Sequence, residues 1–165
     1  MSLSQIIFYS HNLVNLTGGS MRDMVRDILA ACNRYDRGSG LTGALVFNEH
    51  FFLQAMEGEA SRISEQLWKL AADNRHNSMI LLSARPVHER DFRGWMVGYA
   101  GHSEALDALY LRYGPTAKLD PSEMQIPGIV GLLRAFADLD GSHFVQHSGM
   151  PSPAGVQPQP RKATA

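Results

Sequence analysis

One polar side chain lies in a stretch of the sequence that is otherwise apolar. Two apolar runs, Leu41–Phe47 and Phe51–Met56, are joined by a polar turn, a pattern that predicts a β-hairpin. Gln54 lies between Leu53 and Ala55 in the second run, where burial is expected. A buried carboxamide without hydrogen-bond partners costs about 1–3 kcal/mol. Gln54 therefore bonds either to the protein or to a polar group of a ligand, and the sequence alone leaves both open.

The other motifs with residue types suited to chemistry lack the sequence context that the chemistry needs. Residues 38–43 match G-x-G-x-x-G, but a dinucleotide site needs a strand before this motif and a helix after it, and the sequence predicts the reverse order. The seven histidines show no metal-ligand spacing. No serine or cysteine has a recognisable catalytic partner motif. We therefore expect neither an enzyme nor a metal site.

Length and composition favour a single soluble protein. The chain has 165 residues, of which 44% are hydrophobic, which is enough for one domain with a core. A net charge of −1 gives no electrostatic reason to expect nucleic acid or an anionic membrane as a partner. The N-terminal residues lack the pattern of a signal peptide, so none is expected; one cysteine gives no disulfide framework, and there is no apolar run of the roughly 18–20 residues that span a membrane. A cytoplasmic location is the expectation.

Hydrophobic periodicity predicts an α+β fold. Strands are expected at residues 6–9, 41–47, 51–56, 79–84 and 92–100, with helices at 21–35 and from an N-cap at Ser61 to about Asn74. The first six of these elements follow the order βαββαβ of a ferredoxin-like unit, to which a fifth strand is added. Both helices of this unit should cover the same face of the sheet.

The segment after the fifth strand predicts a cover for the other face. Ser103 is placed to cap one helix, and Asp120 to cap a second that Pro127 restarts. We expect residues 1–100 to form the first domain and residues 101–140 a helical extension packed on its sheet. Residues 141–165 are rich in proline and poor in apolar side chains, which predicts a disordered tail.

Several motifs together resemble one known family. They are Tyr9 at the end of the first strand, Leu41-Thr42-Gly43 opening the second, Phe52 to Glu59 (F-L-Q-A-M-E-G-E) on the third, Asp73-Asn74-Arg75-His76 closing the second helix, and Arg90 to Met96 (R-D-F-R-G-W-M) leading into the fifth strand. Their order and spacing resemble a BLUF domain, the blue-light sensor that uses FAD. The resemblance covers about residues 4–100. The two trailing helices resemble those of short BLUF proteins, which have no enzymatic output domain.

The resemblance implies a non-covalently bound flavin between the first two helices, FAD with FMN as the alternative. Tyr9 matches the family tyrosine that donates an electron and a proton to the excited flavin. Gln54 matches the glutamine between that tyrosine and the flavin, whose altered hydrogen bond shifts the absorption to the red. Trp95 matches the tryptophan near the glutamine. The residues expected to contact the cofactor are Asp36, Gln54, Arg75, His76, Ile28 and Ile63.

Two positions depart from the family pattern. Asp36 stands where the family has an asparagine, and an ionised aspartate accepts hydrogen bonds but cannot donate them. We expect this exchange to weaken or retune flavin binding. In the fifth strand, Val97 occupies the usual methionine position and Met96 comes one residue early, which points it to the opposite face. Val97 is the residue expected to face the cofactor, unless a bulge restores Met96.

Two functions follow as expectations. The first is a blue-light photoreceptor, in which light rearranges the hydrogen bonds among Tyr9, Gln54 and the flavin to signal to an unidentified partner protein. Self-association is expected, and neither nucleic acid nor membrane is an expected partner. The alternative, which Asp36 favours, is a light-insensitive BLUF-like interaction module that binds flavin weakly or not at all.

Overall fold

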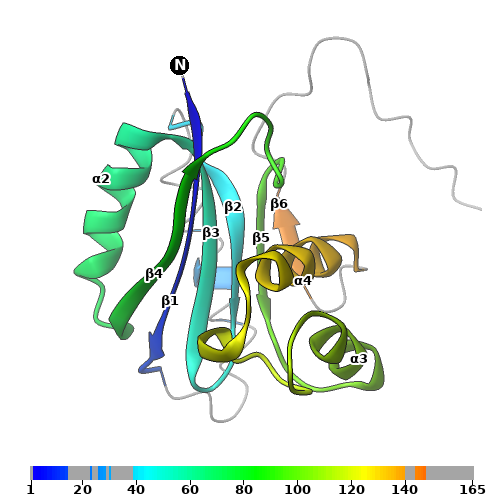
Figure 1. The fold of residues 1–165 in the computed structure, drawn as a ribbon. Helices are drawn as coiled ribbons and strands as arrows, with labels where there is room; N and C mark the ends of the chain where they lie inside the picture. The colour runs from blue at the N-terminus through cyan, green and yellow to red at the C-terminus, as the bar shows by residue number, and fades with distance from the viewer. Residues whose placement is uncertain are drawn as a thin grey trace, which may run out of the picture.

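The computed structural model describes residues 2–14, 23, 26–28, 30 and 39–139, together with the backbone of residues 144–147. Its strands form one mixed sheet in the order β4-β1-β3-β2-β5-β6 (Figure 1). Neighbouring strands are antiparallel except β2 and β5, which run parallel. The strands are β1 (Leu3–Asn12), β2 (Thr42–Phe47), β3 (Phe51–Glu59), β4 (His76–Pro86), β5 (Trp95–Tyr99) and β6 (Phe144–His147).

The helices lie on both faces of the sheet, in the α+β arrangement predicted from the sequence. Helix α2 covers one face, and α3 and α4 cover the other (Figure 1). Apolar side chains of the α3 and α4 face form the larger core, which includes Ile7, Val46, Leu53, Tyr110, Leu132 and Phe136. The described helices are α2 (Ala60–Ala71), α3 (Glu104–Tyr113), the short 3-10 turn η1 (Pro121–Glu123) and α4 (Ile126–Asp138).

The helix ends agree with the predictions in one case and differ in two. Ser103 caps α3, because its side chain accepts a hydrogen bond from the backbone N–H of Leu106. Ser61 is not an N-cap: α2 begins one residue earlier, at Ala60, and the Ser61 hydroxyl donates to the Glu59 carboxylate. Asp120 caps only the 3-10 turn, because the chain becomes extended at Met124 before α4 begins as a separate helix.

The second helix is shorter than predicted, and the fourth strand is longer. Helix α2 ends at Ala71, so Asp73-Asn74-Arg75 forms a turn and His76 is already the first residue of β4. The predicted helix at residues 21–35 lies largely outside the described residues; those described at 26–28 are helical.

The sixth strand was not predicted. Residues 144–147 belong to the expected tail, but their backbone pairs antiparallel with β5. Without β6, one side of β5 would present unpaired backbone N–H and C=O groups, which a short strand can satisfy. The rest of the predicted tail lies outside the described residues.

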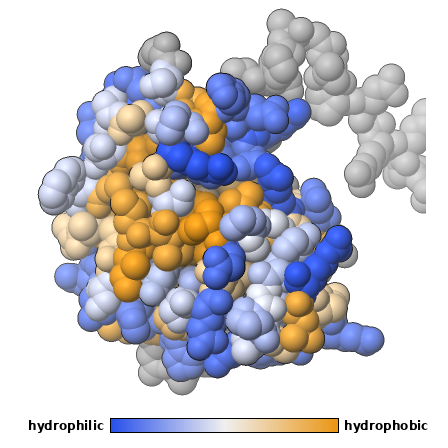
Figure 2. All heavy atoms as spheres, in the orientation of Figure 1, coloured by the Kyte–Doolittle hydropathy of each residue, from blue (hydrophilic) through white to orange (hydrophobic). Residues whose placement is uncertain are grey.

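Strand β4 forms the opposite edge of the sheet and carries exposed apolar side chains. Ile80 and Leu81 point to opposite faces of this strand and are 43% and 56% exposed. Figure 2 shows an apolar area across the middle of the molecule, over the region where β4 lies in Figure 1. An uncovered edge of this kind is open to pairing with another strand.

Candidate functional site

The strand register lines up side chains in rows across the face that α2 covers. Residues directly opposite one another on neighbouring strands point to the same face of a sheet. The middle row runs across β1, β3, β2 and β5 as Phe8, Gln54, Leu45 and Val97. The row on one side is Ile6, Met56, Gly43 and Trp95. The row on the other side is Ser10, Phe52, Phe47 and Tyr99.

Gln54 lies between two separate apolar clusters on this face. One cluster joins the sheet to Ile63 of α2 and contains Phe8, the neighbour of Gln54 on β1. The other contains Ile28 and Leu45, the neighbour of Gln54 on β2. Gln54 is only 5% exposed, yet among the described residues its carboxamide has no hydrogen-bond partner. Its donors and acceptor are therefore available to a ligand held between the two clusters.

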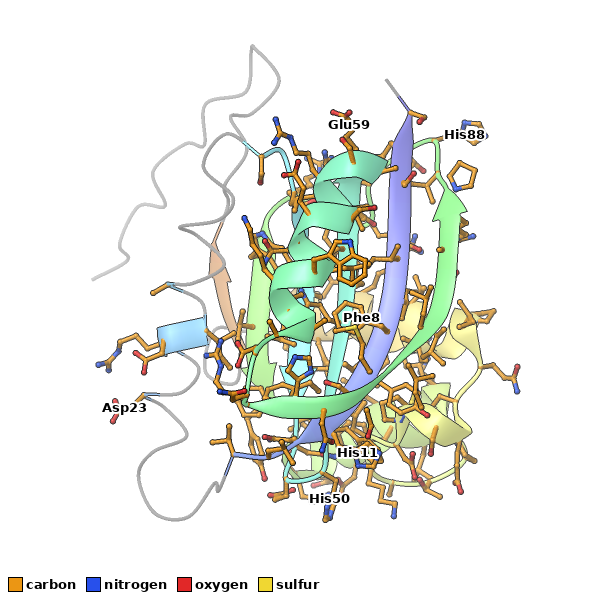
Figure 3. The ribbon with its side chains drawn as sticks, turned by 90° about the vertical axis from the view of Figure 1, so that its left-hand side faces the viewer. Phe8, His11, Asp23, His50, Glu59 and His88 are labelled. Atoms are coloured by element: carbon orange, nitrogen blue, oxygen red, sulfur yellow. The ribbon has the colours of Figure 1, made fainter. Side chains whose placement is uncertain are left out.

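The residue opposite Gln54 on β1 is Phe8, not Tyr9. Figure 3 shows Phe8 on the side of the sheet that α2 covers. Tyr9 is paired with Leu53 and belongs to the core under α3 and α4, with its ring edge-on to that of Phe51 at 5.9 Å between centroids. The prediction that Gln54 lies between Tyr9 and a flavin is wrong, because successive residues of a strand point to opposite faces.

Trp95 lies on the same face as Gln54, in the neighbouring row. The residue beside it on β2 is Gly43, and a Cβ atom added at Gly43 would lie 3.1 Å from the Trp95 ring. The missing side chain thus lets the buried indole lie over β2. The indole Nε1–H donates to the Leu41 carbonyl oxygen at 3.2 Å. Trp95 therefore lies on the same face as Gln54, in the apolar cluster that contains Phe8, and its part in the photochemistry stays a prediction.

The register of β5 also decides between Val97 and Met96. Residues 95–99 pair with β2 without a bulge, so Val97 faces the same side as Gln54. Val97 packs in the cluster that contains Ile28, whereas Met96 packs in the core under α3 and α4. The residue favoured from the sequence is the one that lies on this face.

A family model decides what kind of site this is. The model described as BLUF, sensors of blue-light using FAD, matches residues 3–98. The chain belongs to the BLUF family. BLUF proteins are sensors rather than enzymes, and the cofactor of the family is FAD. A comparison with curated proteins found no match.

Solved BLUF structures share the fold at low sequence identity. BlsA in its photo-activated state has a TM-score of 0.69 and 20% identity, with 84% of this chain and 96% of that chain covered. The BLUF protein BlrB in its dark state has a TM-score of 0.62 and 23% identity, covering 82% and 95%. BlrP1 of Klebsiella pneumoniae with FMN and cyclic diGMP has a TM-score of 0.54 and 22% identity, covering 67% and 30%. These likenesses confirm the ferredoxin-like fold with added strands.

The described residues of this BLUF protein fit a flavin on the Gln54 face. A flat amphipathic ring needs apolar walls and a small number of polar contacts. Ile63 and Trp95 supply walls on one side and Ile28 on the other, and Gln54 supplies a polar group between them. The described residues contain no cluster of metal-ligating side chains, and none of their helices is long and apolar enough to cross a membrane.

Arg75 lies in the turn between α2 and β4 and is paired with Asp73. Its guanidinium contacts both carboxylate oxygens of Asp73, at 2.6 Å for the shortest pair, and these hydrogen bonds lower the pKa of Asp73. Contact between Arg75 and a flavin stays a prediction. The same holds for Asp36, which lies outside the described residues.

His76 ties the end of α2 to β1. Its Nδ1 lies 2.8 Å from the Ser10 hydroxyl, and its Nε2 contacts the carbonyl oxygen of Leu70. A carbonyl can only accept, so Nε2 carries the proton, and a neutral ring then accepts from Ser10 at Nδ1. Both ring nitrogens have protein partners, which gives His76 a structural role whether or not it also contacts a cofactor.

Replacing His76 by alanine should lower the free energy of unfolding by about 1–3 kcal/mol, because buried Ser10 and the end of α2 both lose a partner. Urea denaturation measures the change. His102→Ala is the control, since that ring bonds to exposed Asp107, and it should cost less than about 0.5 kcal/mol. Equal losses in the two variants would contradict this role of His76.

The sequence did not identify a buried network that begins three residues beyond Gln54. Glu57 is fully buried and accepts hydrogen bonds from Gln5 Nε2 at 2.8 Å and from the backbone N–H groups of Asp91 and Phe92 at 2.9 and 3.1 Å. Burial raises the pKa of Glu57, and the hydrogen bonds from Gln5 and from the backbone of Phe92 oppose the shift. Glu57 stands directly before a glycine in the F-L-Q-A-M-E-G-E motif, and this acidic residue in an apolar strand is the sequence feature that could have indicated the network.

The loop between β4 and β5 extends this network in two directions. Arg90 donates to the Gly40 carbonyl at 2.7 Å, to the Thr42 hydroxyl at 2.7 Å and to the Glu57 carbonyl at 2.9 Å. The Asp91 carboxylate accepts from Gln5 at 2.7 Å and forms an ion pair with Arg134 of α4. One loop thus contacts the start of β2, the end of β3 and the C-terminal helix.

Proposed function

We propose that this BLUF protein holds FAD non-covalently on the face that carries Gln54, and that it passes changes at this face to a partner protein through α3 and α4. The observation that carries the proposal is Gln54, a residue that is only 5% exposed and lies between two apolar clusters, and whose carboxamide makes no hydrogen bond to a described residue. A polar ligand with an extended apolar surface satisfies both features.

Three described residues of the face have a definite part in this function. When bound, FAD supplies absorption of blue light and a redox-active ring. The Gln54 amide can donate to one polar atom of the ring and accept from another. Ile63 and Trp95 exclude water from that contact, which strengthens the hydrogen bonds made there. We keep the proposal that Asp36, in place of an asparagine, weakens or retunes the binding.

The Glu57 network supports an output through α4. Gln54 and Glu57 lie on the same strand, three residues apart, and Glu57 bonds the loop that contains Asp91. Asp91 in turn is paired with Arg134 of α4. A displacement of β3 on the cofactor face is therefore transmitted to a helix on the opposite face by direct contacts. The partner that binds α3 and α4 is a protein of unknown identity.

Replacing Gln54 by leucine should weaken FAD binding by about three- to tenfold, because one net hydrogen bond is lost from a buried contact. It should also move the blue absorption band of the bound flavin. Titration of FAD into the protein, followed by flavin fluorescence and absorption, measures both. Tyr9→Phe is the matched control on the same sheet and should leave both unchanged, since Tyr9 faces the other core. Wild-type affinity and spectrum in Gln54→Leu would refute the assigned contact.

The presence of Phe8 opposite Gln54 favours a second candidate function, the light-insensitive interaction module. In that case the folded protein stays colourless and binds no FAD in the titration. Recovery of a yellow protein with one FAD per chain excludes it.

A further inference from the structure

We propose that this protein senses the binding of flavin rather than blue light, because Phe8 occupies the position beside Gln54 at which light sensing requires a donor of an electron and a proton. The inference rests on the proposed function, since it assumes that FAD binds on the Gln54 face. It concerns what the protein does once FAD is there.

The residue beside Gln54 cannot perform the step that the family resemblance implies. Phe8 is directly opposite Gln54 in the β1–β3 register and is 2% exposed, so no other side chain of β1 reaches this place. A phenyl ring has no hydrogen to give up to an acceptor and forms no O–H hydrogen bond to the amide. The phenol of Tyr9 is on the other side of the sheet, in the core under α3 and α4.

The other oxidisable rings described on this face are poorly placed to donate an electron and a proton in place of a tyrosine beside Gln54. Tyr99 lies in a neighbouring row on β5, two strands away from β3, and its hydroxyl donates to Glu49 in the turn between β2 and β3 and not to Gln54. Trp95 lies in the other neighbouring row of β5, also two strands away from β3, and its N–H donates to the Leu41 carbonyl, a group that does not take up a proton. An electron that leaves the indole is therefore not followed by a proton, and returns without changing the hydrogen bonds of Gln54.

The contacts that carry a signal away from this face do not depend on light. Gln54 is on β3, whose Glu57 binds the loop containing Asp91, and Asp91 pairs with Arg134 of α4. Gln5 reinforces the link, because its amide donates to both Glu57 and Asp91. Occupation of the Gln54 face is expected to fix the position of β3, and this network transmits that change to α4 in the dark.

The test measures hydrogen–deuterium exchange of α4 in four conditions, namely with and without FAD, each in the dark and under blue light. The proposal predicts that FAD slows exchange in α4 at least about twofold in the dark and that light adds nothing. The absorption band of bound FAD should likewise not move on illumination. Phe8→Tyr should bind FAD within about twofold of the wild-type affinity and gain a reversible light-induced shift of the band to longer wavelength.

The outcomes separate this inference from the proposed function. Failure of FAD to bind refutes the proposed function. If FAD binds, a reversible light-induced shift in the wild-type protein overturns the inference, and so does a light response that Trp95→Phe abolishes. Unchanged exchange of α4 on FAD binding also overturns it. A Phe8→Tyr variant that binds FAD but shows no light-induced shift of the absorption band refutes the role assigned to residue 8. Tyr9→Phe should change none of these measurements.

Discussion

Replacing Glu57 by alanine should lower the free energy of unfolding by about 3–5 kcal/mol, as measured by urea denaturation. The reason is that three donors lose their acceptor at once: the side chain of Gln5 and the backbone N–H groups of Asp91 and Phe92. Gln5 and Glu57 are fully buried, so water cannot readily replace the missing carboxylate. The loss should also release the loop from the end of β3 and weaken the link to α4.

Glu57→Gln is the matched control, because a carboxamide keeps one acceptor oxygen and removes the charge. Its cost should be smaller, at about 1–2 kcal/mol at neutral pH. A loss as small as this in Glu57→Ala would contradict the account of the network.

The same pair of proteins tests the pKa of Glu57. Burial raises this pKa, so the folded protein holds the proton at a pH where the unfolded chain has released it. The resulting stability is present in full below the ordinary value of 4.5 and is lost as the pH rises through the higher folded-state pKa. Wild-type stability relative to Glu57→Gln should therefore fall with rising pH above 4.5. The nearby charges of Asp91, Arg90 and Arg134 are common to both proteins and cancel in the comparison.

Replacing Phe136 by alanine should destabilise the protein by about 3–5 kcal/mol, because a large aromatic side chain is removed from a closely packed core. Phe136 is fully buried in α4, and its ring is edge-on to that of Tyr110 at 6.0 Å between centroids. Since this core lies on the face away from Gln54, FAD affinity should stay within about twofold of the wild type. Denaturation and FAD titration of the same samples measure the two effects.

Leu111→Ala on α3 is the control for Phe136→Ala, because Leu111 is 59% exposed and should contribute less than about 0.5 kcal/mol. A loss of FAD affinity much larger than about twofold, at a temperature where Phe136→Ala is folded, would show that the flavin is held by the core under α3 and α4 and not by the Gln54 face.

Local patterns in the sequence were sufficient for most elements of the fold. Alternation of apolar residues located β1, the hairpin and β5, and the serine at 103 located the start of α3. Pairing partners were harder, because periodicity describes each segment alone. Strand β6 depends on the unpaired edge of β5, which is a property of the assembled sheet.

The error at Tyr9 has a specific physical origin. Alternation correctly separates Phe8 from Tyr9 onto different faces of β1, but it does not say which face Gln54 shares. That depends on the register between β1 and β3, and a shift of one residue exchanges the two faces. Tyr9 has the phenol that the family mechanism needs, but the register places Phe8 beside Gln54. The Glu57 network could not be predicted for a related reason. It joins β1, β3, a loop and α4, which are far apart in the sequence and meet only in the folded protein.

The central claim is that FAD binds on the face that carries Phe8 and Gln54. Nuclear Overhauser contacts between the protons of the bound flavin ring and methyl groups of selectively labelled protein test it most directly. The account predicts contacts to Ile63 of α2 and Val97 of β5, and none to Leu106 of α3 or Leu132 of α4. Contacts to Leu106 or Leu132 without any to Ile63 would place the flavin on the wrong face and contradict the account.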